Sequence, residues 1–348
     1  MWHGLSMAEG DSGMNGDKIT LAHGAGGRLS QELTEQLILP ELGNSLLNTL
    51  HDGAVLNIAG GQVAFTTDSY VVKPLFFSGG SIGKLAVCGT VNDLAVTGAE
   101  ARYLSLGFIL EEGLELTVLK QIIHDIALAA AEAGVKIVTG DTKVVGHGAA
   151  DGIFINTAGI GEVIPNVSLQ PVNIKPGMDI ILSGTIGDHA ATVMAARHDL
   201  VLPPEIQSDC APLNELAKAI LTAAPDTAVM RDPTRGGLAA VLNELAGQSG
   251  TGMLIEEEKI PIKDEVRGVC DILGLDPLYL ANEGKLVAIV PAERTENVLR
   301  VMHETSYGKD ACCIGKVTPV PGEVGLLTAL GSIRLVDMPM GNIVPRIC

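Results

Sequence analysis

Apolar residues follow two different periods in the first half of the chain. Short runs that are continuous or apolar at every second position predict strands, and longer stretches with apolar residues three or four positions apart predict helices. The predicted strands cover residues 19–22, 54–58, 63–67, 103–110, 137–139 and 154–161, and the predicted helices begin near Leu29, after Ser81 and at Thr117. The strands 54–58 and 63–67 are expected to form a hairpin about Gly60-Gly61, and Ser81 is expected to cap the helix that follows it. Because strands and helices alternate, this half is expected to have an α/β or α+β architecture.

A stretch rich in proline and polar residues, from Pro165 to Pro176, separates this half from a second one with the same alternation. One hydrophobic core rarely serves 348 residues, so two domains are expected. We place them at residues 17–165 and 172–336. Residues 1–16 are polar, glycine-rich and aperiodic, and are predicted to be a disordered extension outside the fold.

Residues 337–348 are expected to form a flexible tail that ends on Cys348. Their prolines and glycine favour an extended arm over a helix, and a thiol on such an arm can move between sites. A free thiol on a frayed end is an equally good interpretation of the tail sequence alone.

Composition limits the classes of function. With 23 Lys and Arg against 41 Asp and Glu, the net charge of −18 makes nucleic acid an unsuitable partner. The sequence opens with no signal peptide and has no apolar run of the roughly 20 residues that a membrane span needs. A cytoplasmic protein with reduced thiols is expected; among its cysteines, Cys88 and Cys270 lie in apolar helical patterns typical of a core.

Carboxylates recur beside glycine-rich loops and predicted strand ends. They are Asp52, Asp68, Asp93, Asp141 and Asp232. A single Asp in such a place is usually a turn residue or a helix cap, but several together would suit Mg²⁺ and a nucleotide, because Mg²⁺ takes oxygen ligands and bridges phosphates. The segment 78–84 is not a Walker A loop, since only three residues separate its glycines and Leu85 follows its lysine.

Three further polar segments carry candidate chemistry. Residues 140–143 are expected to form a loop after a buried strand, with Asp141 and Lys143 either reactive or merely paired at the surface. Residues 231–237 bring together the carboxylate of Asp232, the cation of Arg235 and the backbone N–H donors of Gly236 and Gly237. Glu283 and its neighbours place charge at the margin of a strand.

An ordered set of motifs carries a resemblance that covers the chain from about residue 17 to its end. The motifs are His23-Gly-Ala-Gly-Gly, Thr67-Asp-Ser-Tyr-Val, Gly89-Thr-Val-Asn-Asp-Leu-Ala, Gly140-Asp-Thr-Lys-Val-Val, Asp232-Pro-Thr-Arg-Gly-Gly, Asn282-Glu-Gly-Lys and Pro345-Arg-Ile-Cys. With them the chain resembles the HypE family of hydrogenase maturation proteins, in the PurM-like superfamily named for aminoimidazole ribonucleotide synthetase.

The resemblance implies a two-domain PurM-like α/β fold and a homodimer whose N-terminal domains close into a shared β-barrel, with ATP and Mg²⁺ bound beside it. It also implies a reaction on the terminal thiol. A HypF-type carbamoyltransferase loads a carbamoyl group onto Cys348, ATP-dependent dehydration turns it into an S-cyano group, and a HypC–HypD scaffold complex receives the cyanide for the nickel–iron hydrogenase centre.

Residue roles follow from the same resemblance. Cys348 carries the group, Glu283 acts as base, and Lys143 stabilises charge on the phosphoryl group or orients the carbamoyl group. The implied metal ligands are Asp93, Asp68, Asp232 and Asp52; at the last position members of the superfamily often have a pair of acids, where this chain has His51-Asp52. The implied nucleotide-binding residues are His23, Gly26, Gly27, Asp68, Gly89, Thr90, Asn92, Asp93, Asp141, Thr142 and Arg235. Arg346 is either an anchor for the tail or a solvated cation.

Two other functions stay open. The first is a phosphotransferase of the selenophosphate synthetase type, which would use the same acids but places its reactive Cys or selenocysteine near the N-terminus, where this chain has none before Cys88. The second is a non-enzymatic metal-delivery scaffold that uses Cys348 with histidines as ligands.

Overall fold

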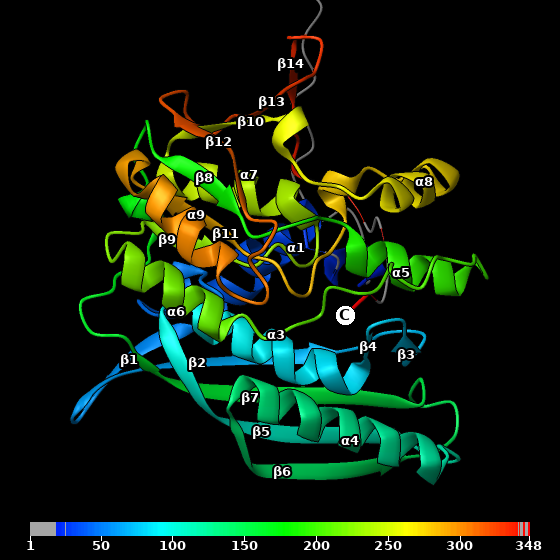
Figure 1. Cartoon of the computed structure of the whole chain (residues 1–348). Helices are drawn as coiled ribbons and strands as arrows, with labels where there is room; N and C mark the ends of the chain where they lie inside the picture. The colour runs from blue at the N-terminus through cyan, green and yellow to red at the C-terminus, as the bar shows by residue number, and fades with distance from the viewer. Residues whose placement is uncertain (1–18, 25, 340, 342–343, 345–346) are drawn as a thin grey trace, which may run out of the picture.

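The computed structural model describes residues 19–348 except 25, 340, 342–343 and 345–346. The predicted extension 1–16 and the predicted role of Arg346 therefore fall outside the described residues. Described residues form two sheet-and-helix units, one above the other in Figure 1, with the C-terminus between them. No helix among the described residues has both the length and the apolar character needed to cross a membrane.

The first unit is a five-stranded sheet covered on one face by two helices (Figure 1). In spatial order its strands are β1 (Ala54–Ile58), β2 (Gly61–Tyr70), β7 (Ile153–Val163), β5 (Ala99–Glu111) and β6 (Lys136–Val145). The helices are α3 (Ile82–Val96), which packs on β2, β5 and β7, and α4 (Leu116–Ala133), which packs on α3. A small hairpin of β3 (Phe76–Phe77) and β4 (Gly80–Ser81) precedes α3.

The helix α3 is apolar on nearly every side because it lies between the sheet and the second unit. The Ser81 side chain caps its N-terminus, as predicted, by accepting a hydrogen bond from the Lys84 N–H. Cys88 is fully buried here, which confirms its predicted place in the core. The opposite face of the sheet exposes Phe65, Ile160 and Tyr103, which are neighbours in register.

The second unit is a seven-stranded sheet with helices on both faces (Figure 1). Its spatial strand order is β14 (Ile333–Leu335), β13 (Val324–Leu327), β10 (Gly252–Glu256), β12 (Cys312–Thr318), β8 (Asp179–Leu182), β11 (Val287–Val290) and β9 (Val229–Arg231). Successive residues of β8 point to opposite faces: Ile180 packs with α7 (Gly237–Ser249), and Ile181 packs with α6 (Asn214–Ala223) and α9 (Thr295–His303).

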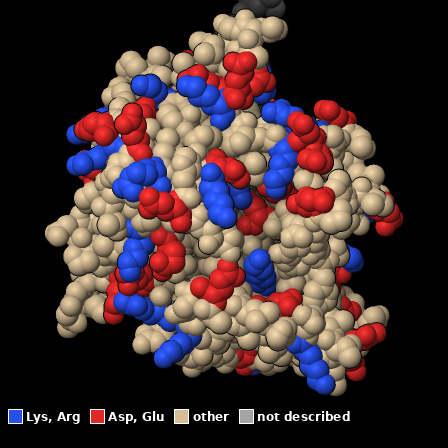
Figure 2. Space-filling view, viewed as in Figure 1, with Lys and Arg blue, Asp and Glu red and all other residues tan. Residues whose placement is uncertain are grey.

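Two more helices of this unit, α5 (Asp188–Arg197) and α8 (Asp264–Leu273), pack together on the side that faces the C-terminus. Cys270 is buried in α8, as predicted. The N-terminal segment adds α1 (Arg28–Leu33), a π-helical turn (Thr34–Ile38) and α2 (Leu39–Leu42). Figure 2 shows acidic and basic side chains interspersed on one face of the molecule.

Most predicted strands and helices are confirmed, and two predictions are wrong. The expected strand at 19–22 is instead a 3₁₀ turn, Leu21–Gly24, in which the His23 ring accepts a hydrogen bond from the Thr20 N–H. The expected loop at 140–143 is the middle of β6, which continues to Val145 along the edge of the sheet. The strand continues through Gly140, Asp141 and Lys143. Its side chains are exposed to solvent, so polar residues are tolerated and no alternation of apolar residues is required.

Candidate active site

The last two residues of the chain lie in a built position between the two units (Figure 1). Ile347 is buried in the same apolar cluster as α3 and α8. The Val71 N–H donates to the Cys348 backbone oxygen at 3.2 Å, and the His189 ring contacts the Ile347 carbonyl oxygen at 2.7 Å. These contacts deliver the Cys348 side chain to polar groups of both units.

The Cys348 thiol lies between a carboxyl group and a guanidinium group. The carboxyl group is that of Glu283, and Nη1 of Arg235 lies 3.8 Å from the Sγ atom. Burial raises the pKa of this thiol well above its usual value, Glu283 raises it further, and the Arg235 guanidinium acts in the opposite direction. The docked cysteine is therefore held as a neutral thiol while part of the residue stays exposed.

Glu283 is a buried acid whose backbone is fixed from both sides. Its N–H donates to Oδ1 of Asp209 at 3.1 Å, and its carbonyl oxygen accepts from the Asn92 amide at 3.4 Å. Its Oε1 atom is buried without a hydrogen-bond partner. Burial raises the pKa of Glu283 well above its usual value, and neighbouring acidic groups add to this effect. A carboxyl group so placed is a strong base once ionised.

Arg235 reaches the thiol from the loop before α7, and glycines allow that loop to pack closely. A Cβ on Gly26 would come within 2.8 Å of the Arg235 carbonyl oxygen, and one on Gly27 within 2.5 Å of the Pro339 carbonyl oxygen. Gly26 and Gly27 of the predicted nucleotide loop therefore pack against the Arg235 loop and against Pro339 of the tail. The pKa of Arg235 is raised by its neighbours Cys348, Asp68, Glu283 and Tyr70. Its side chain therefore stays positively charged.

The four predicted metal ligands gather beside this thiol site and repel one another. Burial and the negative charges of Asp232, Asp52 and Asp68 raise the pKa of Asp93 well above its usual value. Burial and Asp52 raise the pKa of Asp232 to about 7, although Arg231 opposes this shift. Thr66 donates a hydrogen bond to Oδ2 of Asp93 at 2.8 Å.

This donor set fits a magnesium ion that also binds phosphate. Arg231 forms an ion pair with Asp52, whose Oδ2 atom is nonetheless buried without a partner. No three His, Cys, Asp or Glu side chains within the described part of the chain form a ready-made metal centre. Mg²⁺ commonly takes only one or two carboxylates and completes its shell with phosphate and water, so the acids here would hold it together with a nucleotide.

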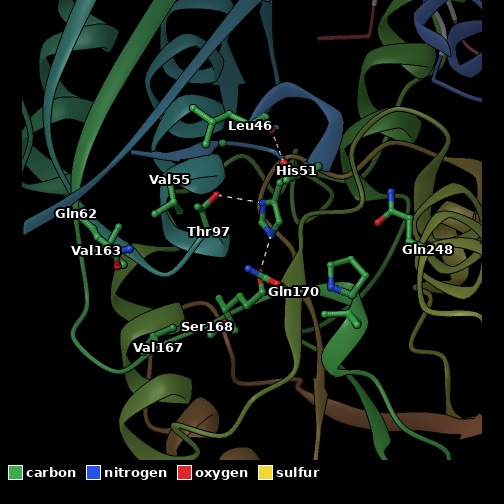
Figure 3. A pocket seen from close by; sticks show the side chains of 15 residues that line it. Leu46, His51, Val55, Gln62, Thr97, Val163, Val167, Ser168, Gln170 and Gln248 are labelled. Atoms are coloured by element: carbon green, nitrogen blue, oxygen red, sulfur yellow. Dashed lines mark hydrogen bonds between the residues drawn. The ribbon is translucent and has the colours of Figure 1, made fainter. Parts of the chain in front are cut away.

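A cavity of about 550 Å³ opens next to the acidic cluster. Its lining includes His51 and Gly53, on either side of Asp52, and Thr97, whose hydroxyl bonds the Asp93 carbonyl oxygen at 2.7 Å. Figure 3 shows the His51 ring between Thr97 and the backbone that precedes Gln170. The rest of the lining mixes apolar, amide and hydroxyl side chains: Leu46, Val55, Val163, Val167, Leu169, Pro171, Val172, Gln62, Gln170, Gln248, Thr49 and Ser168.

Within one copy of the chain, Lys143, Asp141 and Thr142 lie away from Cys348. Register pairs run across the sheet from Asp68 to Thr157, then to Leu106 and Gly140. Paired residues point to the same face of the sheet, and the next residue along a strand points to the other face. Gly140 therefore shares the face of Asp68, and Asp141 points to the opposite face. Three strand spacings separate the two aspartates, which is roughly 14 Å. There Lys143 and Asp141 are exposed and form an ion pair at 2.8 Å.

Three other predicted nucleotide-binding residues make packing contacts. A Cβ on Gly89 would come within 2.3 Å of the Tyr70 hydroxyl oxygen, so only glycine fits there. The Thr90 hydroxyl is buried against Tyr70 and Thr157. The Asn92 side chain joins the two units by bonding the backbone at Ala211, Leu213 and Glu283.

The sequence analysis missed three residues that shape the site. Tyr70 is buried with its hydroxyl in the field of Asp68, Asp93 and Glu283, and these charges and its burial raise its pKa well above the usual value. Arg231 neutralises Asp52, and His189 holds the tail. Tyr70 lies within one quoted motif and Arg231 adjoins another, although neither was given a role, but no pattern links His189 to a segment so distant in sequence.

Comparison with known sequences defines the class of protein. Residues 50–163 match the family described as "AIR synthase related protein, N-terminal domain", and residues 175–327 match "AIR synthase related protein, C-terminal domain". Together these matches cover most of the chain and correspond to the two units of the fold. The protein therefore has the two-domain PurM-like fold that the sequence predicted.

Individual relatives narrow the class further. Carbamoyl dehydratase HypE of Rhodobacter capsulatus is 48% identical over 336 residues, which is 95% of this chain and 98% of the relative. A solved HypE–HypF complex matches with a TM-score of 0.84, 47% identity, and coverage of 88% of this chain and 99% of the other. HypE in complex with ATP matches with a TM-score of 0.81, 47% identity, and coverage of 94% and 100%. The chain belongs to the HypE carbamoyl dehydratase family.

Proposed function

We propose that this protein uses ATP to dehydrate an S-carbamoyl group on Cys348 to an S-cyano group. This reaction supplies the cyanide ligand for maturation of nickel–iron hydrogenases. The names of its relatives and the ATP complex of one of them support the assignment. The observation that carries it is the docked Cys348 thiol, which lies within reach of both Glu283 and Arg235.

The reaction needs ATP because a carbamoyl oxygen is a poor leaving group. Expelling it directly would release hydroxide, the conjugate base of water with a pKa of about 15.7. When the carbamoyl oxygen attacks the terminal phosphorus of ATP, ADP leaves and that oxygen becomes part of a phosphate ester. Breaking the carbon–oxygen bond then releases phosphate, and the two nitrogen protons depart as the carbon–nitrogen triple bond forms.

Glu283 and Arg235 divide this chemistry between them. The group carried by Sγ would occupy the space between them, so Arg235 can donate hydrogen bonds to the carbamoyl oxygen and turn it toward the phosphate. The ionised Glu283 carboxylate takes a proton from the nitrogen. Burial serves this step in two ways, because it strengthens Glu283 as a base and keeps out water that would compete for the carbon.

The acidic cluster and the adjoining cavity provide a place for the nucleotide. The phosphates and Mg²⁺ would lie at Asp93, Asp68, Asp232 and Asp52, where the ion would neutralise the repulsion among these carboxylates. The nucleoside would occupy the cavity lined by His51 and Gln170. This arrangement assigns Gly89, Thr90 and Asn92 to shaping the site, and His23, Gly26 and Gly27 to packing the loop that carries Arg235.

Lys143 enters the mechanism only if a second copy of the chain supplies it. The exposed sheet face with Phe65, Tyr103 and Ile160 is suited to burial against another copy, as the expected barrel across a homodimer requires. Lys143 and Asp141 lie on this face, by the alternation of the strand. We assign Lys143 to the phosphoryl group of the second copy's site, together with Asp141, whereas Thr142 points to the other face of the sheet and takes no part there.

The protein must also exchange groups with partners. A HypF-type carbamoyltransferase supplies the carbamoyl group, as the complex of a relative with HypF supports. A HypC–HypD scaffold complex receives the cyanide. Because Cys348 is docked beside Glu283, the tail must leave this position to meet either partner, which keeps the prediction of a flexible tail.

The mass of the C-terminal peptide tests this function. The protein is incubated with carbamoyl phosphate, Mg²⁺, a HypF-type partner and a non-hydrolysable ATP analogue, which is then replaced by ATP. We expect the peptide to gain a carbamoyl group on Cys348 and then to lose the mass of one water only after ATP is added. If the partner modifies another HypE while Cys348 stays unmodified, the proposed function is wrong and free phosphoryl acceptors should be screened.

A further inference from the structure

The contact between His189 and the tail has a defined chemical direction. The Ile347 carbonyl oxygen accepts hydrogen bonds only, so the Nε2 atom of His189, at 2.7 Å, must carry a proton. The other ring nitrogen, Nδ1, lies 2.8 Å from the Ser208 hydroxyl oxygen. That oxygen accepts from the Cys210 N–H at 3.1 Å, which leaves the hydroxyl proton free to point at Nδ1.

The imidazole ring is therefore locked as one neutral tautomer within a continuous chain of donors. The chain runs from the Cys210 N–H through Ser208 and His189 to the Ile347 carbonyl oxygen. The ring is fully buried, and the edge of Phe77 packs against it with 5.3 Å between ring centroids and an interplanar angle of 81°. A ring held this firmly offers a preformed donor to whatever backbone occupies the position of Ile347.

We infer that His189 is a positioning residue that latches the tail and so sets the fraction of time that Cys348 spends beside Glu283. This inference rests on the proposed function, because dehydration requires the docked tail whereas carbamoyl transfer and cyanide delivery require its release. The latch is suited to reversible use. It consists of one side-chain hydrogen bond, the backbone bond from Val71 and the burial of Ile347.

Alkylation of Cys348 measures docking without ATP or any partner. A docked thiol with a raised pKa reacts slowly with iodoacetamide, and a released thiol reacts as an ordinary cysteine. Peptide mass spectrometry separates Cys348 from the half-buried Cys312 and Cys313, which serve as internal references. Ile347→Asp gives the rate of the released tail, and His124→Ala, an exposed residue of α4, is the matched histidine control.

Two conservative variants separate the latch from general packing. Gln places its amide nitrogen near the position of Nε2 and can still donate to Ile347, whereas Asn reproduces only the position of Nδ1. We expect His189→Asn to raise the labelling rate of Cys348 about fivefold, the factor that corresponds to a hydrogen bond of about 1 kcal/mol. His189→Gln should stay within about twofold of the wild type.

A purely structural role for His189 would produce a different result. Labelling of Cys348 at the wild-type rate in His189→Asn, with Ile347→Asp reacting faster, would overturn the latch. Equal rates in the wild type and Ile347→Asp would also overturn it, since the tail would then not dock. If His189→Asn fails to fold, Ser208→Ala replaces it, because losing the hydroxyl frees the tautomer while the ring keeps its packing, and the same rise is expected.

A second readout links the latch to the reaction. With a HypF-type partner, His189→Asn should accept the carbamoyl group at least as fast as the wild type and dehydrate it several times more slowly. The two ideas can fail separately. If neither the wild type nor any variant dehydrates the carbamoyl group, the proposed function is wrong. The latch still stands in that case, provided that Cys348 is alkylated faster in His189→Asn and Ile347→Asp than in the wild type.

Discussion

The Cys348 thiol lies beside the Glu283 carboxyl group, although the two residues are far apart in the sequence. Neither group has a low-energy charged state in this position, because burial raises the pKa of both. Once the sulfur carries a carbamoyl group, the same position puts the nitrogen protons of that group beside the Glu283 carboxyl group.

Replacing Glu283 with Gln should abolish dehydration and spare carbamoylation. Gln keeps the size of the side chain but cannot accept a proton, and a positioned general base contributes about 100- to 10,000-fold in rate. Single-turnover mass analysis of the C-terminal peptide should show the carbamoyl adduct forming normally and persisting after ATP is added. A rate within a few-fold of the wild type would assign the base to another group.

The pH dependence of dehydration follows from the raised pKa of Glu283. The carboxyl group is protonated below this pKa and works as a base above it, so the rate should rise with pH through a value above the usual range of Glu. Besides burial, the titratable groups around Glu283 that influence its pKa are Cys210, Asp209, Asp232, Asp68 and Arg235. Rates measured on preloaded protein at saturating ATP should show this rise, and a flat profile would argue against Glu283.

The same shift makes a prediction about stability. A carboxyl group with a raised folded-state pKa binds its proton more tightly in the folded protein, so the free energy of unfolding falls as pH rises from the unfolded pKa through the folded one. Glu283→Gln removes this loss. The melting temperature of Glu283→Gln should therefore rise relative to that of the wild type as the pH increases from 5 to 9. A difference in melting temperature that does not change with pH would contradict the raised pKa of Glu283.

Magnesium and nucleotide should stabilise the protein more at pH 8 than at pH 6. Asp232, with a pKa of about 7, takes up a proton at the lower pH, and a cation must displace it; the pKa of Asp93 is shifted in the same direction by burial and its neighbouring acids. Asp232→Asn should raise the melting temperature of the metal-free protein at pH 8 and reduce the further increase that Mg²⁺-ATP causes. Arg102→Gln, at an exposed ion pair remote from this cluster, is the control and should leave the Mg²⁺-ATP increase unchanged.

Mixed dimers should reveal whether Lys143 acts on the second copy. Lys143→Ala and Glu283→Gln are each expected to be inactive alone. Because Lys143 is remote from Cys348 in its own copy, a mixed dimer should have one intact site and about a quarter to a half of wild-type dehydration, depending on mixing. No recovery in mixtures shown to exchange subunits would place Lys143 outside the reaction.

The sequence predicted the fold well where local patterns decide the structure. The hairpin of β1 and β2, the Ser81 cap and the apolar helix α3 all follow from period and capping chemistry. It failed at β6, because an exposed edge strand has no apolar alternation to identify it. The exposure of Lys143 on the far face of the sheet could not be foreseen, since facing depends on register across three other strands.

The candidate site was only partly predictable. The motifs selected Cys348, Glu283 and Arg235 as functional residues, but spacing could not show that Arg235 lies against the thiol. His189 belongs to the site through tertiary contacts alone, and the motif that contains Tyr70 does not show that its hydroxyl lies in the field of Asp68, Asp93 and Glu283. Glycines that suggested a phosphate cradle, such as Gly26, also allow close packing of two backbones. Both uses require the same absence of a side chain, so sequence does not separate them.

Infrared spectroscopy of isolated, carbamoylated protein tests the central claim most directly. The protein is loaded from ¹³C-labelled carbamoyl phosphate, freed of the partner enzyme and mixed with Mg²⁺-ATP. In the wild type we expect a carbon–nitrogen triple-bond stretch that shows the ¹³C isotope shift and grows as ADP is formed. In Glu283→Gln we expect no such band. ADP formation without that band, or an equal band in Glu283→Gln, would contradict dehydration at Cys348 by Glu283.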